Sequence, residues 1–240
     1  MEETHTIPGI KFVNGFFWGV LVLAIALALL ILVIPASTFL AYSNYLQIIA
    51  SLAGAVAFFV LWNRSEKQFL LLAGTAFLLW GVSNIGWYIY ALTGQRSLVF
   101  PSIIDAGIIA SIFLLAAAYK KGLPDKTHAP WLSLSGIIAC LIIPVVVIFF
   151  TGMSAATLVL LLYFLACGGL LLTGLNHSLM EHPVLLVGTL FFAVAFLIYP
   201  LREMFFATST ILSVIGTFVS AGFALIVLGL VQYFVQEETT

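Results

Sequence analysis

Long apolar runs separated by short breaks dominate the chain. A transmembrane helix needs roughly 20 mostly apolar residues at a rise of about 1.5 Å each. Eight stretches of the sequence meet this requirement, at about 15–35, 45–62, 68–92, 102–119, 131–150, 154–173, 184–206 and 210–235. The pattern therefore predicts an all-α integral membrane protein with eight transmembrane helices.

Residues that disfavour helices or favour turns lie between these runs. Pro35, Gly94, Pro101, Pro130 and Pro183 mark five of the breaks. The weakest break is Thr151-Gly152-Met153, and without it the number of spans would fall to seven. We predict that this break holds.

Composition excludes several classes of protein. Of the 240 residues, 63% are hydrophobic and only 7% are charged, whereas a soluble domain carries roughly 25% charged residues. The net charge is -1, so the chain has no basic surface for nucleic acid. A soluble globular protein, a disordered chain and a nucleic-acid binder are therefore excluded.

The basic residues are unevenly divided between the two predicted sides of the membrane. One side carries Lys11, Arg64, Lys67, Lys120, Lys121 and Lys126, and the other carries only Arg96 and Arg202. Cytoplasmic loops are enriched in Lys and Arg. We therefore expect a multi-pass protein of the cell membrane with both termini in the cytoplasm.

The third and seventh predicted spans share a short sequence. Leu71–Phe77 matches Leu185–Phe191 at five of seven positions, with an offset of 114 residues, and Tyr119 falls on Tyr233 at the same offset. We predict two parallel four-helix repeats, 1–125 and 126–240, that together form one membrane domain. Chance similarity between two Leu-rich and Gly-rich helices is the alternative.

Polar residues gather at similar depth in three of the predicted spans. An ionisable side chain at mid-bilayer costs about 2.5–3.5 kcal/mol on insertion scales, so such residues point to function. We predict a ligand pocket in the outer leaflet between the third, fourth and seventh spans. Its candidate ligand-binding residues are Asn84, Trp87, Tyr88, Ser102, Asp105, Arg202 and Glu203.

A purely structural interpretation is also open for the ionisable residues. Asp105 lies in the first turn of its predicted helix, where a carboxylate favours the helix dipole, and Ser102 is suited to the N-cap. Arg202 and Glu203 can form an ion pair at the membrane interface.

Catalytic and cofactor motifs are missing from the sequence. No predicted span contains a histidine or a lysine in its core, which disfavours bound haem and excludes a retinal Schiff base. We expect no catalytic residues, no cofactor and no metal. A loop metal site formed by His177, Glu181 and His182 is an alternative.

The region from Leu78 to Leu115 carries a short motif. Leu79-Trp80-Gly81 and Trp87 are followed by Gly94 and then by Pro101-Ser102-x-x-Asp105. This region resembles the multi-span N-terminal membrane sensor regions of prokaryotic signalling proteins, of the histidine kinase or diguanylate cyclase type. The resemblance covers about one sixth of the chain and implies a membrane-embedded sensory or ligand-binding module.

Three features depart from the pattern of those sensor regions. Asn84 stands where an Asp is expected, and Ala106–Ile109 replaces an expected aromatic-Leu pair. Only Gln236–Thr240 follows the last predicted span, so the resemblance implies a sensor region without an output domain, which either stands alone or is cut from a longer chain.

The leading hypothesis is a sensory or small-ligand-binding module rather than an enzyme. A small transporter or channel with its site between the two repeats is the first alternative, and a structural subunit of a membrane complex is the second. The expected partners are membrane lipid, a small-molecule ligand and a cytoplasmic or membrane signalling protein. We expect no nucleic acid.

Overall fold

A computed structural model describes residues 22, 26, 36–92, 100–125, 130–205 and 209–239. Within these residues the chain forms seven long helices and a single 3-10 turn, and no strand. The helices are α2 (Ala36–Ser65), α3 (Gln68–Leu92), α4 (Ile103–Gly122), α5 (Pro130–Thr151), α6 (Ala155–Asn176), α7 (Pro183–Phe205) and α8 (Ser209–Thr239), with η1 (Ser178–Glu181) between α6 and α7. Apart from Val22 and Ala26, the first predicted span lies outside the described residues.

The helix ends agree closely with the predicted spans. Helix α2 begins at Ala36, and the part of it that could cross a membrane is Asn44–Ser65, which agrees with the second predicted span at about 45–62. Its first turns contain Ser37, Thr38 and Ser43, which interrupt the apolar run and so hide helical residues from a hydropathy criterion.

The weakest predicted break is confirmed. Helix α5 ends at Thr151, and Gly152 adopts a positive φ of 79°, which a residue with a side chain rarely adopts. Ser154 then caps α6, because its hydroxyl accepts a hydrogen bond from the Thr157 backbone N–H at 3.2 Å. The two apolar runs are therefore separate helices.

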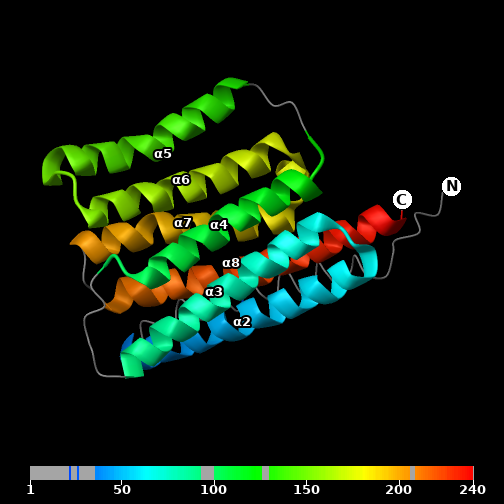
Figure 1. Cartoon of the computed structure of the whole chain (residues 1–240), viewed down its shortest axis with the longest axis horizontal. Coiled ribbons are helices and arrows are strands. Elements are labelled where there is room, and N and C mark those ends of the chain that lie inside the picture. The colour runs from blue at the N-terminus through cyan, green and yellow to red at the C-terminus, as the bar shows by residue number, and fades with distance from the viewer. Residues whose placement is uncertain are drawn as a thin grey trace.

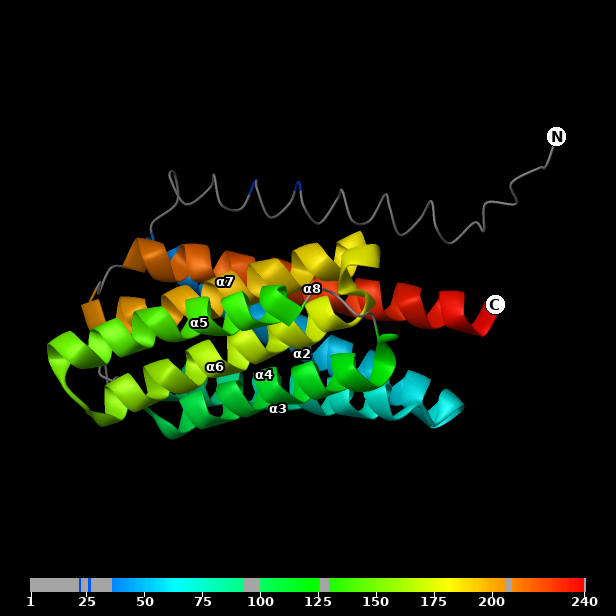
Figure 2. The same cartoon turned by 90° about the horizontal axis from the view of Figure 1, so that it is seen from above.

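The fold is that of a multi-pass helical membrane protein. Six of the described helices are long and apolar enough to cross a membrane. The helices run along one common axis and alternate in direction (Figure 1; Figure 2). The main packing partners are α2 with α3 and α8, α3 with α4, α4 with α6, α5 with α6, α6 with α7, and α7 with α8. Helix α5 lies at the edge of the bundle and packs mainly on α6.

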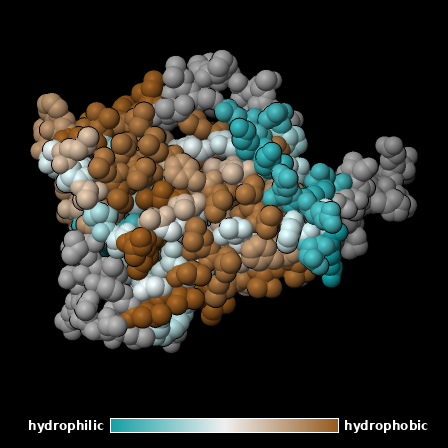
Figure 3. Space-filling view, viewed as in Figure 1, coloured by the Kyte–Doolittle hydropathy of each residue, from teal (hydrophilic) through white to brown (hydrophobic). Residues whose placement is uncertain are grey.

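The two ends of the bundle differ in polarity. Hydrophilic residues gather at the end where α8 finishes, whereas the body of the visible face is apolar (Figure 3). We call this the polar end. It is defined by Arg64 at the end of α2, Lys67 directly before α3, and Lys120 and Lys121 at the end of α4. The opposite end, where α4, α6 and α8 begin, is called the distal end.

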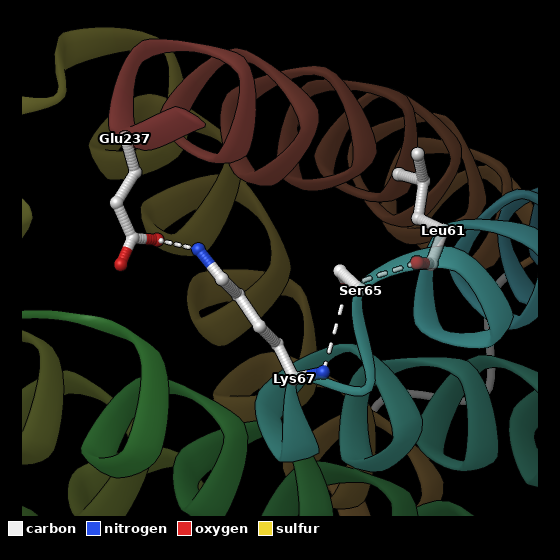
Figure 4. Close-up of polar contacts among 4 residues, drawn as sticks. All are labelled: Leu61, Ser65, Lys67 and Glu237. Atoms are coloured by element: carbon white, nitrogen blue, oxygen red, sulfur yellow. Dashed lines mark hydrogen bonds and ion pairs between the residues drawn. The ribbon is translucent and has the colours of Figure 1, made fainter. Parts of the chain in front are cut away.

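Polar contacts tie helices together at the polar end. Lys67 Nζ lies 3.0 Å from a carboxylate oxygen of Glu237, which joins the start of α3 to the last turns of α8 (Figure 4). The Ser65 hydroxyl donates to the Leu61 carbonyl at 2.9 Å and so satisfies an acceptor near the end of α2. His177 Nε2 lies 2.9 Å from Asp125 Oδ1 and links the end of α4 to the α6–α7 connection.

A layer of aromatic side chains fills the centre of the bundle. The Trp80 ring contacts Phe192, Phe196 and Phe223 at centroid distances of 5.8, 4.7 and 5.1 Å, and Phe77 contacts Phe223 at 4.8 Å. All five side chains are buried. Helices in lipid associate through van der Waals packing, so this layer is a main source of cohesion between α3, α7 and α8.

Helices α7 and α8 approach each other through glycine. A Cβ atom added at Gly188 would lie 2.8 Å from the backbone nitrogen of Ile226. At Gly229 an added Cβ would lie 2.8 Å from the backbone of Leu185. The two backbones are therefore too close for a side chain at either position, as in other membrane helix pairs with small residues at the contact.

Candidate functional site

A cavity of about 150 Å³ lies in the distal half of the bundle. Five helices contribute to its wall, namely α2, α3, α4, α7 and α8. Aromatic side chains make up much of the lining, with Trp80 and Trp87 from α3 and Phe196 and Tyr199 from α7. An engineered apolar cavity of about 150 Å³ binds benzene, so this space suits a molecule of roughly one ring.

Amide side chains supply the polar part of the wall. Asn44 and Gln47 come from α2, one turn apart, and Asn84 comes from α3. Asn84 Nδ2 donates to the Trp80 carbonyl at 3.2 Å. Gln47 Nε2 donates to the Gly216 carbonyl of α8 at 3.4 Å. Gln47 and Asn84 are only 6% and 8% exposed, so these amides are held by buried hydrogen bonds.

The described residues that line the cavity include no charged side chain. The remaining lining is apolar or backbone, from Ile108 of α4 and from Ile215, Gly216 and Val219 of α8. Burying a charge in such surroundings is costly without an opposite charge. The arrangement therefore favours a neutral ligand with some hydrogen-bonding capacity.

Trp80 forms part of the cavity wall and carries a hydrogen-bond donor, its indole N–H. Its side chain is 2% exposed, and its indole Nε1–H has no hydrogen-bond acceptor among the described residues. A buried donor without an acceptor costs about 1–3 kcal/mol. Native structures rarely leave such a group without a reason.

Asp105 does not line the cavity but lies beside it, on the side of α6. The carboxylate is 1% exposed. Its Oδ2 atom accepts the Ser102 backbone N–H at 2.7 Å and the Ser102 hydroxyl at 2.9 Å. Its Oδ1 atom accepts the Tyr163 hydroxyl at 2.9 Å. Three donors thus stabilise this carboxylate, and they fasten the start of α4 to α6.

The expected N-cap role of Ser102 is confirmed. Ser102 is the N-cap of α4, and Asp105 at the third position of the helix bonds back to it, as in one half of a capping box. The Tyr163 ring lies 5.7 Å from that of Tyr199, which faces the cavity and interacts with the same carboxylate. Tyr199 therefore connects Asp105 to the cavity wall.

The structure separates the remaining predicted site residues. Asn84 and Trp87 line the cavity. Tyr88 is turned toward α2, where its hydroxyl is hydrogen-bonded to that of the exposed Tyr45. Arg202 and Glu203 form an ion pair with each other near the end of α7, and both side chains are mostly buried. Neither of these two residues is part of the cavity lining.

Sequence reasoning missed several residues of the site. Asn44 and Gln47 are polar residues three positions apart, and Ser51 lies one further turn along α2. Polar residues at helical spacing in an apolar run are a signal that points to one helix face. Tyr163 offers no such signal, since it is 58 residues from Asp105 in the sequence and their contact arises only from the fold.

The histidines at the polar end take part in structural contacts. Among the described residues no group of three or more His, Cys, Asp or Glu side chains is arranged to hold a metal ion. His177 pairs with Asp125, and the His182 ring packs on Tyr233 at 5.2 Å. Partial burial lowers the pKa of His182, and the nearby Glu181 opposes this effect.

Comparisons with known proteins give no match. No protein-family model matches the chain, and neither a curated protein nor a solved structure is significantly similar to it. The functional argument therefore rests on the residues of the cavity.

Proposed function

We propose that the protein is a membrane-embedded sensory or small-ligand-binding module whose pocket lies in the outer leaflet. The observation that carries this proposal is the cavity in the distal half of the bundle, with its aromatic walls and its three amide side chains. Binding sites for small molecules are typically mostly apolar with a few convergent polar groups, and this cavity has that character.

The outer-leaflet location depends on the orientation of the bundle. Arg64, Lys67, Lys120 and Lys121 lie at the polar end, and we place that end in the cytoplasm by the positive-inside rule. The C-terminus and, with eight spans, the N-terminus are then cytoplasmic. The distal end, where α3 ends and α4 begins, faces outward.

We further propose that the chain consists of two parallel four-helix repeats, 1–125 and 126–240. The contacts between helices support this proposal. In such a repeat α2 corresponds to α6, α3 to α7 and α4 to α8. The contacts α3–α4, α2–α3 and α4–α6 then correspond to the contacts α7–α8, α6–α7 and α8–α2. All of these pairs are in contact, and the cavity lies between the two halves.

A signal would pass from the cavity along α8. This helix contributes Ile215 and Val219 to the cavity wall and ends at the polar end, where Glu237 pairs with Lys67. A ligand that fits only one arrangement of the two halves shifts the population toward that arrangement. A cytoplasmic or membrane signalling partner would read the change at this end, as the resemblance to sensor regions implies.

A transporter is the second candidate, and the pseudo-symmetric packing favours it. Parallel repeats with a site between them suit alternating access. The aromatic layer argues for the sensor instead, because Phe77, Phe192 and Phe223 lie one turn from the cavity toward the polar end and are buried. A ligand in the cavity would have to displace this layer in order to cross.

Native mass spectrometry of the protein released from its own membranes tests the proposed function. We expect a discrete small-molecule adduct on the wild type and its loss in Val219→Phe, which fills the cavity from α8. Val194→Phe is the matched control, because Val194 is 44% exposed on the outside of α7. An adduct of the same mass on all three proteins, or on none, would contradict the proposal.

A further inference from the structure

We propose that the cavity binds a neutral carbonyl compound about one ring in size, whose carbonyl oxygen accepts a hydrogen bond from the Trp80 indole N–H. This inference rests on the proposed function and names the chemical class of its ligand. The juxtaposition that carries it is a cavity wall formed by a side chain that is 2% exposed and whose donor has no acceptor among the described residues.

The unused donor calls for an acceptor. The indole N–H can only donate, so the complementary group on a ligand is a lone pair such as that of a carbonyl oxygen. The Trp80 ring is fixed between Phe196 and Phe223, which fixes the position of its nitrogen as well. The nitrogen itself has less than 1 Å² of accessible surface, so a ligand acceptor reaches it by a small shift of the surrounding side chains, and no hydrogen bond with a described residue is lost.

The surroundings of Trp80 decide the charge and the size of the ligand. The described lining residues include no Asp, Glu, Lys or Arg, and the neighbouring Asp105 carboxylate already accepts three hydrogen bonds from Ser102 and Tyr163. An ionised ligand would find no countercharge in the wall and would be disfavoured. The volume of about 150 Å³ limits the ligand to about one ring.

The amide side chains of the cavity wall fit the same class of ligand. Asn84 and Gln47 each use one amide N–H on a backbone carbonyl, of Trp80 and Gly216 respectively. A primary amide nitrogen carries two hydrogens, so Asn84 has a second N–H besides the one in this bond. A carboxamide ligand has both an acceptor for Trp80 and hydrogens for the amide oxygen of Asn84.

Benzamide, toluene and benzoate are suitable probes, added to the full-length protein in lipid nanodiscs at matched free concentrations. The protein has five tryptophans, so ¹⁵N-indole labelling gives five N–H signals, and Trp80→Phe identifies that of Trp80. We expect benzamide to shift the Trp80 indole proton downfield and to bind about tenfold more tightly than toluene, since one hydrogen bond of about 1.4 kcal/mol corresponds to a factor of ten.

Trp80→Phe should reduce the ratio of the two affinities to about one while toluene still binds, because the ring remains and only the donor is lost. Trp62→Phe is the control, since Trp62 lies in the last turns of α2 toward the polar end, and it should leave the ratio unchanged. If Trp80→Phe fails to fold, substituting the other four tryptophans one at a time assigns the Trp80 signal by elimination, and its shift in the wild type then decides the matter.

The outcomes separate this inference from the proposed function. Equal affinity for benzamide and toluene in the wild type would overturn the ligand class and leave the cavity as a binding site. Tighter binding of benzoate than of benzamide would overturn the neutral charge. Binding of none of the probes would also overturn the inference, and the adduct experiment with Val219→Phe would then decide separately whether the cavity binds any small molecule.

Discussion

Replacing Tyr163 by Phe removes one hydroxyl from the hydrogen bonds around the buried Asp105 carboxylate. The hydroxyl donates to Asp105 Oδ1 at 2.9 Å, and it is the link by which α6 is bonded to the start of α4. The ring of Tyr163 stacks on Phe196 at 6.1 Å and would stay in place. The substitution therefore tests the hydrogen bond with little change in packing.

The magnitude follows from the charge on the acceptor. Hydrogen bonds to charged groups contribute about 1.5–3 kcal/mol, and a buried carboxylate that loses a donor keeps its desolvation cost. Hydrogen bonds between uncharged side chains of membrane helices average only about 0.6 kcal/mol. We therefore expect Tyr163→Phe to lower the free energy of unfolding by about 1.5–3 kcal/mol.

Reversible unfolding by sodium dodecyl sulfate in mixed micelles measures this free energy, and two other tyrosines provide controls. Tyr119 is fully buried and donates to Thr189 Oγ1 at 2.6 Å, because the Thr189 hydroxyl itself donates to the Leu185 carbonyl. Tyr119→Phe removes a neutral bond and should cost about 0.6 kcal/mol. Tyr45 is 44% exposed, and Tyr45→Phe should change stability by less than about 0.5 kcal/mol.

The order of the three variants carries the argument. The reasoning is refuted if Tyr163→Phe is no more destabilising than Tyr119→Phe, since the acceptor of Tyr163 would then behave as an uncharged group. A double-mutant cycle with Asp105→Asn adds a second criterion. The coupling between the two positions should exceed about 1 kcal/mol, because residues in one hydrogen-bonded network are not additive.

Two further predictions concern the α7–α8 contact and the polar end. Gly188→Ala should lower the free energy of unfolding by about 1–3 kcal/mol, because the added Cβ would lie 2.8 Å from the Ile226 backbone nitrogen. Gly169→Ala is the control and should be neutral or stabilising, because an added Cβ there would have nothing within 4 Å. Equal effects of the two substitutions on unfolding by sodium dodecyl sulfate would contradict the close contact between α7 and α8. Burial lowers the pKa of His182 in the folded state, so the unfolded chain takes up the proton first and stability should fall as the pH drops below about 6.5. His182→Gln should make the free energy of unfolding less dependent on pH between pH 7 and 5. An unchanged slope would contradict the assignment of this decline to His182.

The order and the bounds of the described helices follow from the sequence. A run of about 20 apolar residues in lipid can pair its backbone N–H and C=O groups only by forming a helix. Hydropathy and breaks such as Gly152 therefore locate the helices without knowledge of how they pack. The exception is the start of α2, where Ser37 and Thr38 make helical residues look like a loop. The role of Ser102 as an N-cap is equally local and was predictable.

The composition of the cavity was decided by tertiary structure. Depth in the membrane can be predicted from the sequence, and similar depth grouped Asn84 with Trp87, which both line the cavity. Which face of a helix turns toward which neighbour cannot be read from an apolar sequence, because lipid and protein interior select similar side chains. Packing alone turns Tyr88 toward Tyr45, and it directs Asp105 to Tyr163 and brings Gln47 beside Gly216.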